Sequence, residues 1–323
     1  MNTNYVQKRK SLNFLALIIT SVVLTACGGG GGGGGDASPP TASPPPVGPT
    51  VTGSVTKGPV NAATVQFFNL DSRGNATGNS LASTTTDANG VFSVTLPAGT
   101  GTVLVVSSGG SFIDESDQEP DANLKRQIQL SSGQGFVSLL PAGENVVAIN
   151  PYTHALVARA RLLSEAAGGF LGLFNTAKTI LGTQAGFDVL TTIPANPTAP
   201  AADATLAQKQ YALLLGGIAN AINNVSIQLG QQAPSYEVII AVTADFIDGT
   251  LDGHVFGEPV SVSQTGSDVT SLGPFLPTNI ILNTEITRFR NNNFANYTDT
   301  ALPSIETTLL LNIDAPTLLG TLP

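Results

Sequence analysis

The chain has 323 residues, and its 13 Lys and Arg against 22 Asp and Glu give a formal charge of −9 at pH 7. This acidic balance argues against nucleic acid as a partner. Hydrophobic residues make up 41% of the chain, which is enough for a packed core, and the single cysteine excludes both an internal disulfide framework and a multi-cysteine metal site.

The first 26 residues have the pattern of a signal peptide. Three cations, Lys8 to Lys10, precede an apolar stretch from Leu12 to Leu24, which is shorter than the roughly 20 residues that a membrane-spanning helix needs. The segment Leu24-Thr-Ala-Cys27 resembles the bacterial lipobox. This resemblance implies cleavage between Ala26 and Cys27 and attachment of lipid to the Cys27 thiol. Because Gly28 replaces the aspartate that tends to retain a lipoprotein in the inner membrane, we expect export to the outer membrane.

Residues 27–49 read as a tether. Eight consecutive glycines, Gly28 to Gly35, predict a flexible coil, and the proline-rich stretch that continues to Pro49 favours extended geometry. A protein held in this way has the membrane as a partner through its lipid anchor. The sequence leaves open whether the following domains face the periplasm or the cell surface.

Residues 50–148 are predicted to form an antiparallel β-sandwich. Alternating apolar residues and turn signals recur about every ten residues, and Asp87-Ala-Asn-Gly90 reads as a hairpin turn between two strands. The expected strands are 51–56, 64–68, 80–86, 91–96, 102–107, 127–131 and 136–140.

Four motifs in this region resemble a carboxypeptidase-regulatory-like domain of the prealbumin type. They are Thr52-Gly-Ser-Val-Thr-Lys-Gly-Pro-Val60, Ala63-Thr-Val65, Thr86-Asp-Ala-Asn-Gly-Val-Phe92 and Leu96-Pro97. The resemblance implies a small β-sandwich, but it does not imply peptidase activity. The zinc motif of those peptidases is H-x-x-E, whereas Ala-Leu-Val follows His154 and Val-Phe-Gly follows His254.

Residues 149–323 are predicted to be mainly α-helical, without strands between the helices, and to form an orthogonal bundle. Asn150-Pro151 offers an N-cap followed by proline at the first helical position. Gly216-Gly217 lowers the helix propensity of its segment, so close packing against a neighbour is expected there. The expected helices are 150–166, 170–181, 203–229, 234–246, 277–292 and 302–311.

Two acidic groups are candidate calcium ligands. Asp245, Asp248 and Asp252 lie close together in sequence, although their spacing does not fit an EF-hand and helix-ending Asp-Gly turns explain the same residues. The second group lies in a loop that we interpret as solvated surface, with calcium as the alternative. Its members are Asp114, Glu115, Asp117, Glu119 and Asp121.

Other candidate residues lie on both sides of the expected domain boundary. His154 and His254 are interpreted as structural or surface histidines rather than catalytic bases. Lys57 raises the question of an intramolecular isopeptide bond, as in adhesin β-sandwiches, but the sequence offers no matched asparagine and acid partner. A candidate contact surface combines cations and aromatics near the C-terminus; the alternative is the frayed end of a helix with cations at its negative dipole end. The residues of this surface are Arg288, Arg290, Phe294 and Tyr297.

The sequence therefore predicts a multidomain α+β protein, with an antiparallel β-sandwich followed by an α-helical bundle. We find no assembled catalytic motif and no cofactor motif. The leading hypothesis is an envelope lipoprotein with a non-catalytic binding or structural role, whose ligand is an unidentified protein or small molecule. The alternatives are a secreted hydrolase whose active site leaves no local motif, and an accessory subunit of a surface assembly.

Overall fold

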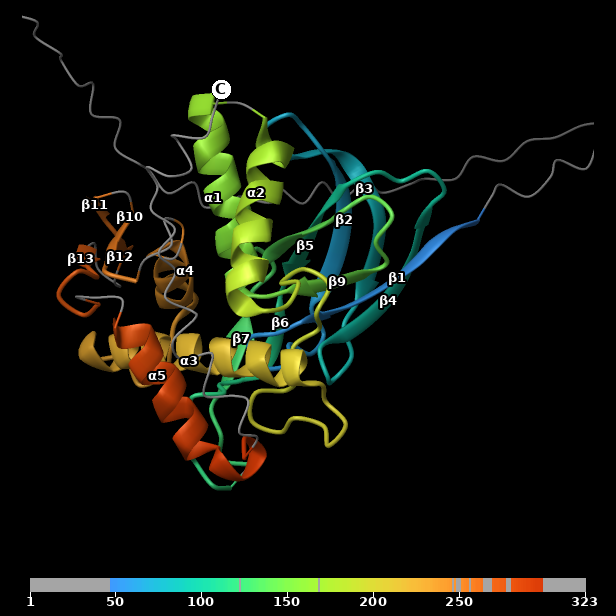
Figure 1. The fold of residues 1–323 in the computed structure, drawn as a ribbon. Coiled ribbons are helices and arrows are strands. Elements are labelled where there is room, and N and C mark those ends of the chain that lie inside the picture. The colour runs from blue at the N-terminus through green and yellow to red at the C-terminus, as the bar shows by residue number, and fades with distance from the viewer. Residues whose placement is uncertain are drawn as a thin grey trace, which may run out of the picture. The chain divides into compact units, whose positions relative to one another are not determined.

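The computed structural model describes residues 47–298, apart from 122, 168, 246, 248–250, 256, 264–268 and 277–279. Over these residues the chain has mixed α and β content, with several antiparallel strand pairings in the N-terminal half and the helices after them (Figure 1). The leader, the lipobox and most of the predicted tether lie outside the described residues.

One sheet has three strands in the order β4-β1-β9. Its central strand β1 (Val47–Val55) begins inside the segment predicted as tether, and it pairs antiparallel with β4 (Val91–Pro97). On its other side β1 pairs parallel with β9 (Val146–Ile149). The prediction of antiparallel strands throughout is therefore wrong for this sheet, because β9 was not predicted and returns to β1 in the parallel direction.

A second sheet has four antiparallel strands in the order β3-β2-β5-β8. Every side chain of β5 from Val103 to Ser107 is buried, as its uninterrupted apolar sequence predicts for a central strand. Phe67 of this sheet meets Phe92 of the first sheet edge to face, with ring centroids 6.2 Å apart. Apolar side chains of the two sheets are thus in contact. The strands are β2 (Thr64–Leu70), β3 (Ala76–Thr85), β5 (Val103–Ser108) and β8 (Val137–Leu140).

The predicted hairpin at Asp87–Gly90 is wrong in its pairing although the turn forms. The Asp87 carboxylate accepts hydrogen bonds from the backbone N–H groups of Asn89 and Val91, both at 2.9 Å, and Gly90 has a φ of +73°. The strands that the turn connects, β3 and β4, belong to different sheets. The turn therefore carries the chain from the four-stranded sheet to the three-stranded one.

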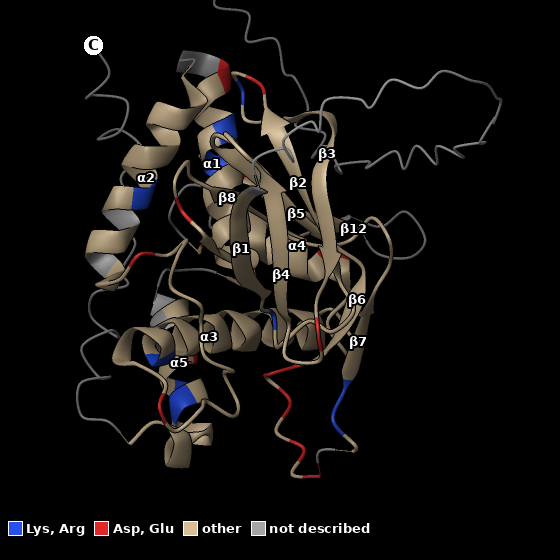
Figure 2. Ribbon diagram, turned by 90° about the vertical axis from the view of Figure 1, so that its right-hand side faces the viewer, with Lys and Arg blue, Asp and Glu red and all other residues tan. Residues whose placement is uncertain are grey.

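A two-stranded antiparallel ribbon consists of β6 (Gly110–Ile113) and β7 (Gln127–Leu130). The strand β6 was not predicted. The loop between β6 and β7 holds the second acidic group of the sequence, and it ends in the cations Lys125 and Arg126. Figure 2 shows the acidic residues along the chain that leaves β6 and the cations on its return to β7.

Helix α1 (Pro151–Ala167) begins as predicted. The Asn150 side chain accepts a hydrogen bond from the Thr153 backbone N–H at 3.0 Å, and the Thr153 hydroxyl accepts one from the Asn150 N–H at 3.0 Å. The helix packs on β8 and β9. Arg159 of this helix is buried, and its guanidinium donates a 2.7 Å hydrogen bond to the Ile247 carbonyl.

The remaining helices include α2 (Phe170–Ala185), α3 (Leu206–Gln228) and α5 (Ile280–Asn292), and they follow the predicted segments closely. A Cβ added at Gly216 would collide with the Phe289 ring, and one at Gly217 would collide with Ile286. The predicted close packing at these glycines is thus confirmed, with α5 as the neighbour of α3. The other helical elements are α4 (Tyr236–Asp245) and the short 3-10 helix η2 (Phe294–Asn296); the helix expected at 302–311 lies outside the described residues.

Short strands lie between α4 and α5, contrary to the prediction that no strands interrupt the helices. They form two antiparallel ribbons, β10-β11 and β12-β13. Each strand has only two or three residues, which is too short to establish a period of two in the sequence. The strands are β10 (His254–Val255), β11 (Glu258–Pro259), β12 (Ser261–Ser263) and β13 (Val269–Ser271).

Candidate functional site

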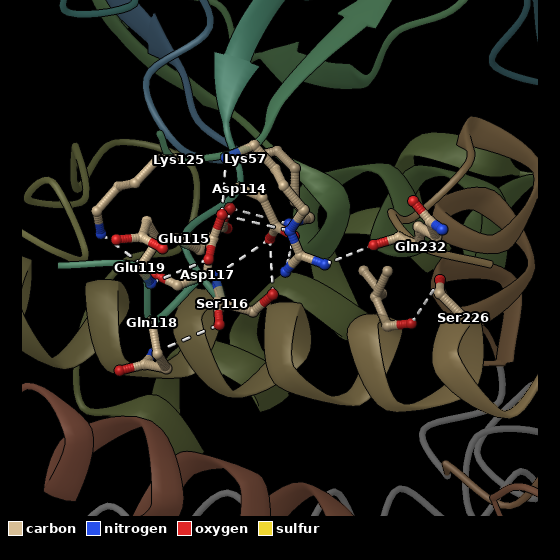
Figure 3. A network of polar contacts seen from close by, with 12 residues as sticks. Lys57, Asp114, Glu115, Ser116, Asp117, Gln118, Glu119, Lys125, Ser226 and Gln232 are labelled. Carbon is tan, nitrogen blue, oxygen red and sulfur yellow. Dashed lines mark hydrogen bonds and ion pairs between the residues drawn. The ribbon is translucent and has the colours of Figure 1, made fainter. Parts of the chain in front are cut away.

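Three buried charged side chains, Lys57, Asp114 and Glu115, lie where β1 and β6 end. Together with the partly exposed Asp117 and Arg126 they form a group of ion pairs that we call the buried charge cluster (Figure 3). Lys57 comes two residues after β1, in a tight turn closed by a bridge between Thr56 and Pro59.

The turn after β1 lies directly against β6, because Gly58 has a φ of +61° and no side chain. A Cβ at Gly58 would collide with the carbonyl oxygen of Ile113, the last residue of β6. Asp114 and Glu115 follow Ile113 immediately. The close approach of two backbone segments therefore brings the Lys57 amine to the acidic loop.

Lys57 and Glu115 form an ion pair that is almost completely enclosed. The Lys57 Nζ donates a hydrogen bond to Glu115 Oε2 at 2.9 Å, and each side chain is 1% exposed. The same Nζ lies 5.3 Å from the centroid of the Phe112 ring, within cation–π range. Burial raises the pKa of the Glu115 carboxyl, the positive charge of Lys57 lowers it, and the negative charge of Asp114 raises it further, with a net increase.

Arg126 holds the other two carboxylates of the buried charge cluster. Its Nη2 lies 3.0 Å from Asp114 Oδ2 and its Nε lies 3.4 Å from Asp117 Oδ2. Its Nη1 donates a 2.9 Å hydrogen bond to the carbonyl of Gln232, which lies shortly before α4. One guanidinium thus joins the acidic loop to the helical part of the chain.

The Asp114 and Asp117 carboxylates are also held by the loop itself. Asp114 Oδ1 accepts hydrogen bonds from the backbone N–H and the hydroxyl of Ser116, at 3.1 and 2.7 Å. Burial alone would raise the pKa of Asp117, but hydrogen bonds from the backbone N–H groups of Arg126 and Glu119 lower it further than burial raises it. The interpretation of this loop as solvated surface is wrong for Asp114 and Glu115, which are buried.

The candidate calcium residues near α4 are only partly described. Asp245 is buried, and its Oδ2 accepts a 2.9 Å hydrogen bond from the Gly253 N–H; Asp252 Oδ1 accepts one from the His254 N–H at 3.0 Å. Asp248 lies outside the described residues. Among the residues that are described, no three His, Cys, Asp or Glu side chains are grouped to hold a metal ion. The calcium hypothesis for Asp245, Asp248 and Asp252 therefore stays a prediction.

The candidate contact surface near the C-terminus is divided by the fold. Phe294 is 58% exposed, and Arg288 is exposed while it pairs with Glu285 at 2.9 Å. Arg290 is partly buried. Including Tyr297 in this surface was wrong, because Tyr297 is 1% exposed and its hydroxyl donates a 2.6 Å hydrogen bond to the Pro197 carbonyl.

The two histidines occupy different environments. Desolvation of the His154 ring, together with the nearby positive charge of Arg161, lowers its pKa to about 4. The ring packs edge to face on Phe136, with centroids 6.3 Å apart. His254 has a side chain that is 43% exposed, and its Nδ1 lies 3.0 Å from the Asp252 carbonyl oxygen. Both environments agree with the interpretation of structural or surface histidines.

Comparison of the chain with protein-family models, with curated proteins and with solved structures gave no match. Within the described part of the chain, no helix is both long enough and apolar enough to cross a bilayer. Cys27 and Ala26, the predicted lipidation and cleavage residues, lie outside the described residues.

Sequence reasoning noted Lys57 and Glu115 separately but did not bring them together, and it missed Arg126. The pair is 58 residues apart in sequence, so no local pattern reports it. One clue was available: charged residues are only 11% of the chain, yet a lysine directly follows a predicted strand and lies in a segment without other charges. A lone charge in such a segment requires a partner if the segment is buried.

Proposed function

We propose that the protein is a lipid-anchored lipoprotein of the bacterial outer membrane whose folded part has a non-catalytic structural or binding role. The anchor is supported by the basic start, the apolar run, and Cys27 as the single cysteine in the chain at the end of a lipobox-like motif. Several acyl chains, each contributing about 0.8 kcal/mol per buried CH₂, hold a protein firmly on a bilayer without a spanning helix.

We further propose that residues 50–148 form a prealbumin-like β-sandwich. The two sheets and the edge-to-face contact between Phe67 and Phe92 support this arrangement. The proposal also uses the motif resemblance of residues 52–97, which includes Lys57-Gly-Pro-Val60 at the end of β1. We also propose that a separate helical domain follows this sandwich from residue 149.

The observation that carries the structural role is that polar side chains join the strands to the helices. Arg126 donates to the Gln232 carbonyl, and the Tyr236 hydroxyl exchanges two hydrogen bonds with the backbone of Gly135, at 2.9 and 3.0 Å. Arg161 donates two hydrogen bonds to the Gly74 carbonyl, at 2.8 and 3.0 Å. Two arginines and a tyrosine thus fix the strand-containing half of the described body against its helices, which favours a rigid module displayed on a tether.

The anchoring proposal is tested by metabolic labelling with a palmitate analogue and by detergent phase partition. The wild-type chain is expected to take up label and to enter the detergent phase, whereas Cys27→Ala is expected to do neither. The matched control Gly28→Asp keeps the cysteine, so it should still take up label but move from the outer-membrane fraction to the inner-membrane fraction. Unchanged partition of Cys27→Ala would refute lipid anchoring at this residue.

The face of the membrane is decided by protease treatment of intact cells, with a periplasmic protein as the control for lysis. Release of peptides from the described body, residues 47–298, places the body outside the cell and favours adhesion or surface assembly. Protection until the outer membrane is broken places it in the periplasm and favours a structural role in the envelope. Recovery of a stoichiometric partner after mild detergent extraction would favour an accessory subunit.

A further inference from the structure

The Lys57–Glu115 contact is poorly compensated as a simple ion pair. Glu115 Oε2 is the one hydrogen-bond acceptor of the Lys57 amine among the described residues, although an ammonium group carries three N–H donors. The second carboxylate oxygen, Glu115 Oε1, is buried and accepts no hydrogen bond from any other described residue. Burying two charges has a large desolvation cost, and this cost is recovered only when additional hydrogen bonds satisfy both groups.

From this enclosure and contact we propose that Lys57 and Glu115 are joined by an intramolecular isopeptide bond between the lysine Nζ and the glutamate Cδ. The amide has one N–H donor and one carbonyl acceptor and carries no charge. It therefore removes both buried charges, and it leaves one N–H donor and one carbonyl oxygen to be satisfied in place of three N–H donors and two carboxylate oxygens. The proposal concerns the folded body alone and does not depend on lipid anchoring.

The reaction is a condensation that balances without a co-reactant. A proton first passes from the Lys57 ammonium to the Glu115 carboxylate, which gives a neutral amine and a neutral acid. The nitrogen lone pair then attacks Cδ and forms the N–C bond, while the carbonyl electron pair moves to oxygen. A proton moves from nitrogen to the hydroxyl oxygen, the C–O bond breaks, and one water leaves as the carbonyl re-forms.

The fold supplies the conditions that this step needs. It holds the amine and the carboxyl in contact at 2.9 Å, so the reaction is intramolecular and its entropy cost is largely met by folding. Burial raises the pKa of the Glu115 carboxyl, with a net increase despite the opposing charge of Lys57, so this carboxyl accepts a proton more readily than an exposed glutamate does. Exclusion of water from the pair also disfavours the reverse hydrolysis.

A second lysine–carboxylate contact in the chain provides an internal control. Lys178 Nζ lies 2.8 Å from Asp188 Oδ2, but these side chains are 23% and 38% exposed. Here hydrogen bonds from Lys178 and from the loop backbone lower the pKa of the Asp188 carboxyl despite partial burial, so the ionised pair is favoured. We expect no condensation at this contact, although its distance is as short as that of Lys57 and Glu115.

The test is peptide mapping of the full chain after denaturation and digestion with a protease that cleaves before aspartate. Such a digest releases Lys57 within peptide 36–70 and Glu115 within the tripeptide 114–116. The expected product is a single branched peptide whose mass is the sum of the two less one water. Peptides 121–187 and 188–202, which carry Lys178 and Asp188, are expected to be recovered separately.

The variant Lys57→Arg keeps the positive charge but has no condensable amine, so it is expected to give peptides 36–70 and 114–116 as separate species. Recovery of only separate peptides from the folded wild-type protein would overturn the proposal and leave the contact as an ion pair. A branched species of the same composition in Lys57→Arg would also overturn it, because the link would then lie at another residue. Fragment ions of the wild-type branched peptide are expected to place the link at Lys57 and Glu115.

Discussion

Replacing Gly217 with alanine tests the packing of α3 on α5. The new methyl group would collide with the Ile286 side chain and lie 3.0 Å from the Ile286 Cα and backbone N, so a side-chain rotation alone cannot relieve the contact. Alanine gains about 1 kcal/mol of helix propensity over glycine, while overpacking of a buried site costs about 1–3 kcal/mol. Because Ile286 is fully buried, the packing cost should outweigh the propensity gain, and we expect a net loss of up to about 2 kcal/mol in the free energy of unfolding.

The matched control is Gly172→Ala in α2, where an added Cβ has no neighbour within 4 Å. This substitution carries the propensity gain without the collision, so it should leave stability unchanged or raise it by up to about 1 kcal/mol. Urea unfolding followed by circular dichroism measures both variants, and the difference between them isolates the packing cost. A Gly217→Ala variant as stable as Gly172→Ala would refute the close contact between the two helices.

Three further predictions concern single side chains. Thr205→Ala removes the N-cap of α3, where the Thr205 hydroxyl accepts a hydrogen bond from the Gln208 N–H at 3.3 Å. Urea unfolding should show a loss of stability of about 1 kcal/mol, and Thr205→Ser should restore it. The pKa of His154 falls from 6.5 to about 4 on folding, so the unfolded chain binds the proton more readily than the folded chain does. The free energy of unfolding should therefore fall as the pH drops from about 6.5 to about 4. An equal dependence of this free energy on pH in His154→Gln would contradict the prediction. Tyr297→Phe should lower stability by about 1 kcal/mol, because it removes the 2.6 Å hydrogen bond of a buried hydroxyl. Phe294→Ala should change stability by no more than about 0.5 kcal/mol, because Phe294 is exposed. Equal losses of stability in thermal unfolding would argue against the assigned burial.

Local chemistry made several elements predictable from the sequence. Asn150 before Pro151 predicted the start of α1, because a side-chain oxygen can satisfy a free N–H of the first turn. The alternation in 91–96 predicted β4, and the buried side chains of Phe92 and Leu96 follow from it. These features depend on residues within a few positions of one another.

Features that depend on distant residues could not be predicted in this way. The turn residues from Asp87 to Gly90 specify a reversal of the chain, but they do not specify whether the flanking strands pair with each other. The parallel pairing of β9 with β1 joins Thr52 to Val146, far apart in sequence. Lys57 and Glu115 meet for the same reason, through a close approach of backbones at Gly58 that composition does not reveal.

The position of β1 in the middle of its sheet determines how the described body responds to tension that enters at Val47. A pull along β1 acts in shear on two ladders, one to β4 over Thr50–Ser54 and one to β9 over Thr52–Val55. Because β1 is central, both ladders must break before it leaves the sheet, whereas an edge strand is held by one ladder alone. Lys57 lies two residues beyond the end of β1, so its contact with Glu115 links the end of this strand to the loop that follows β6, which Arg126 links in turn to the segment before α4.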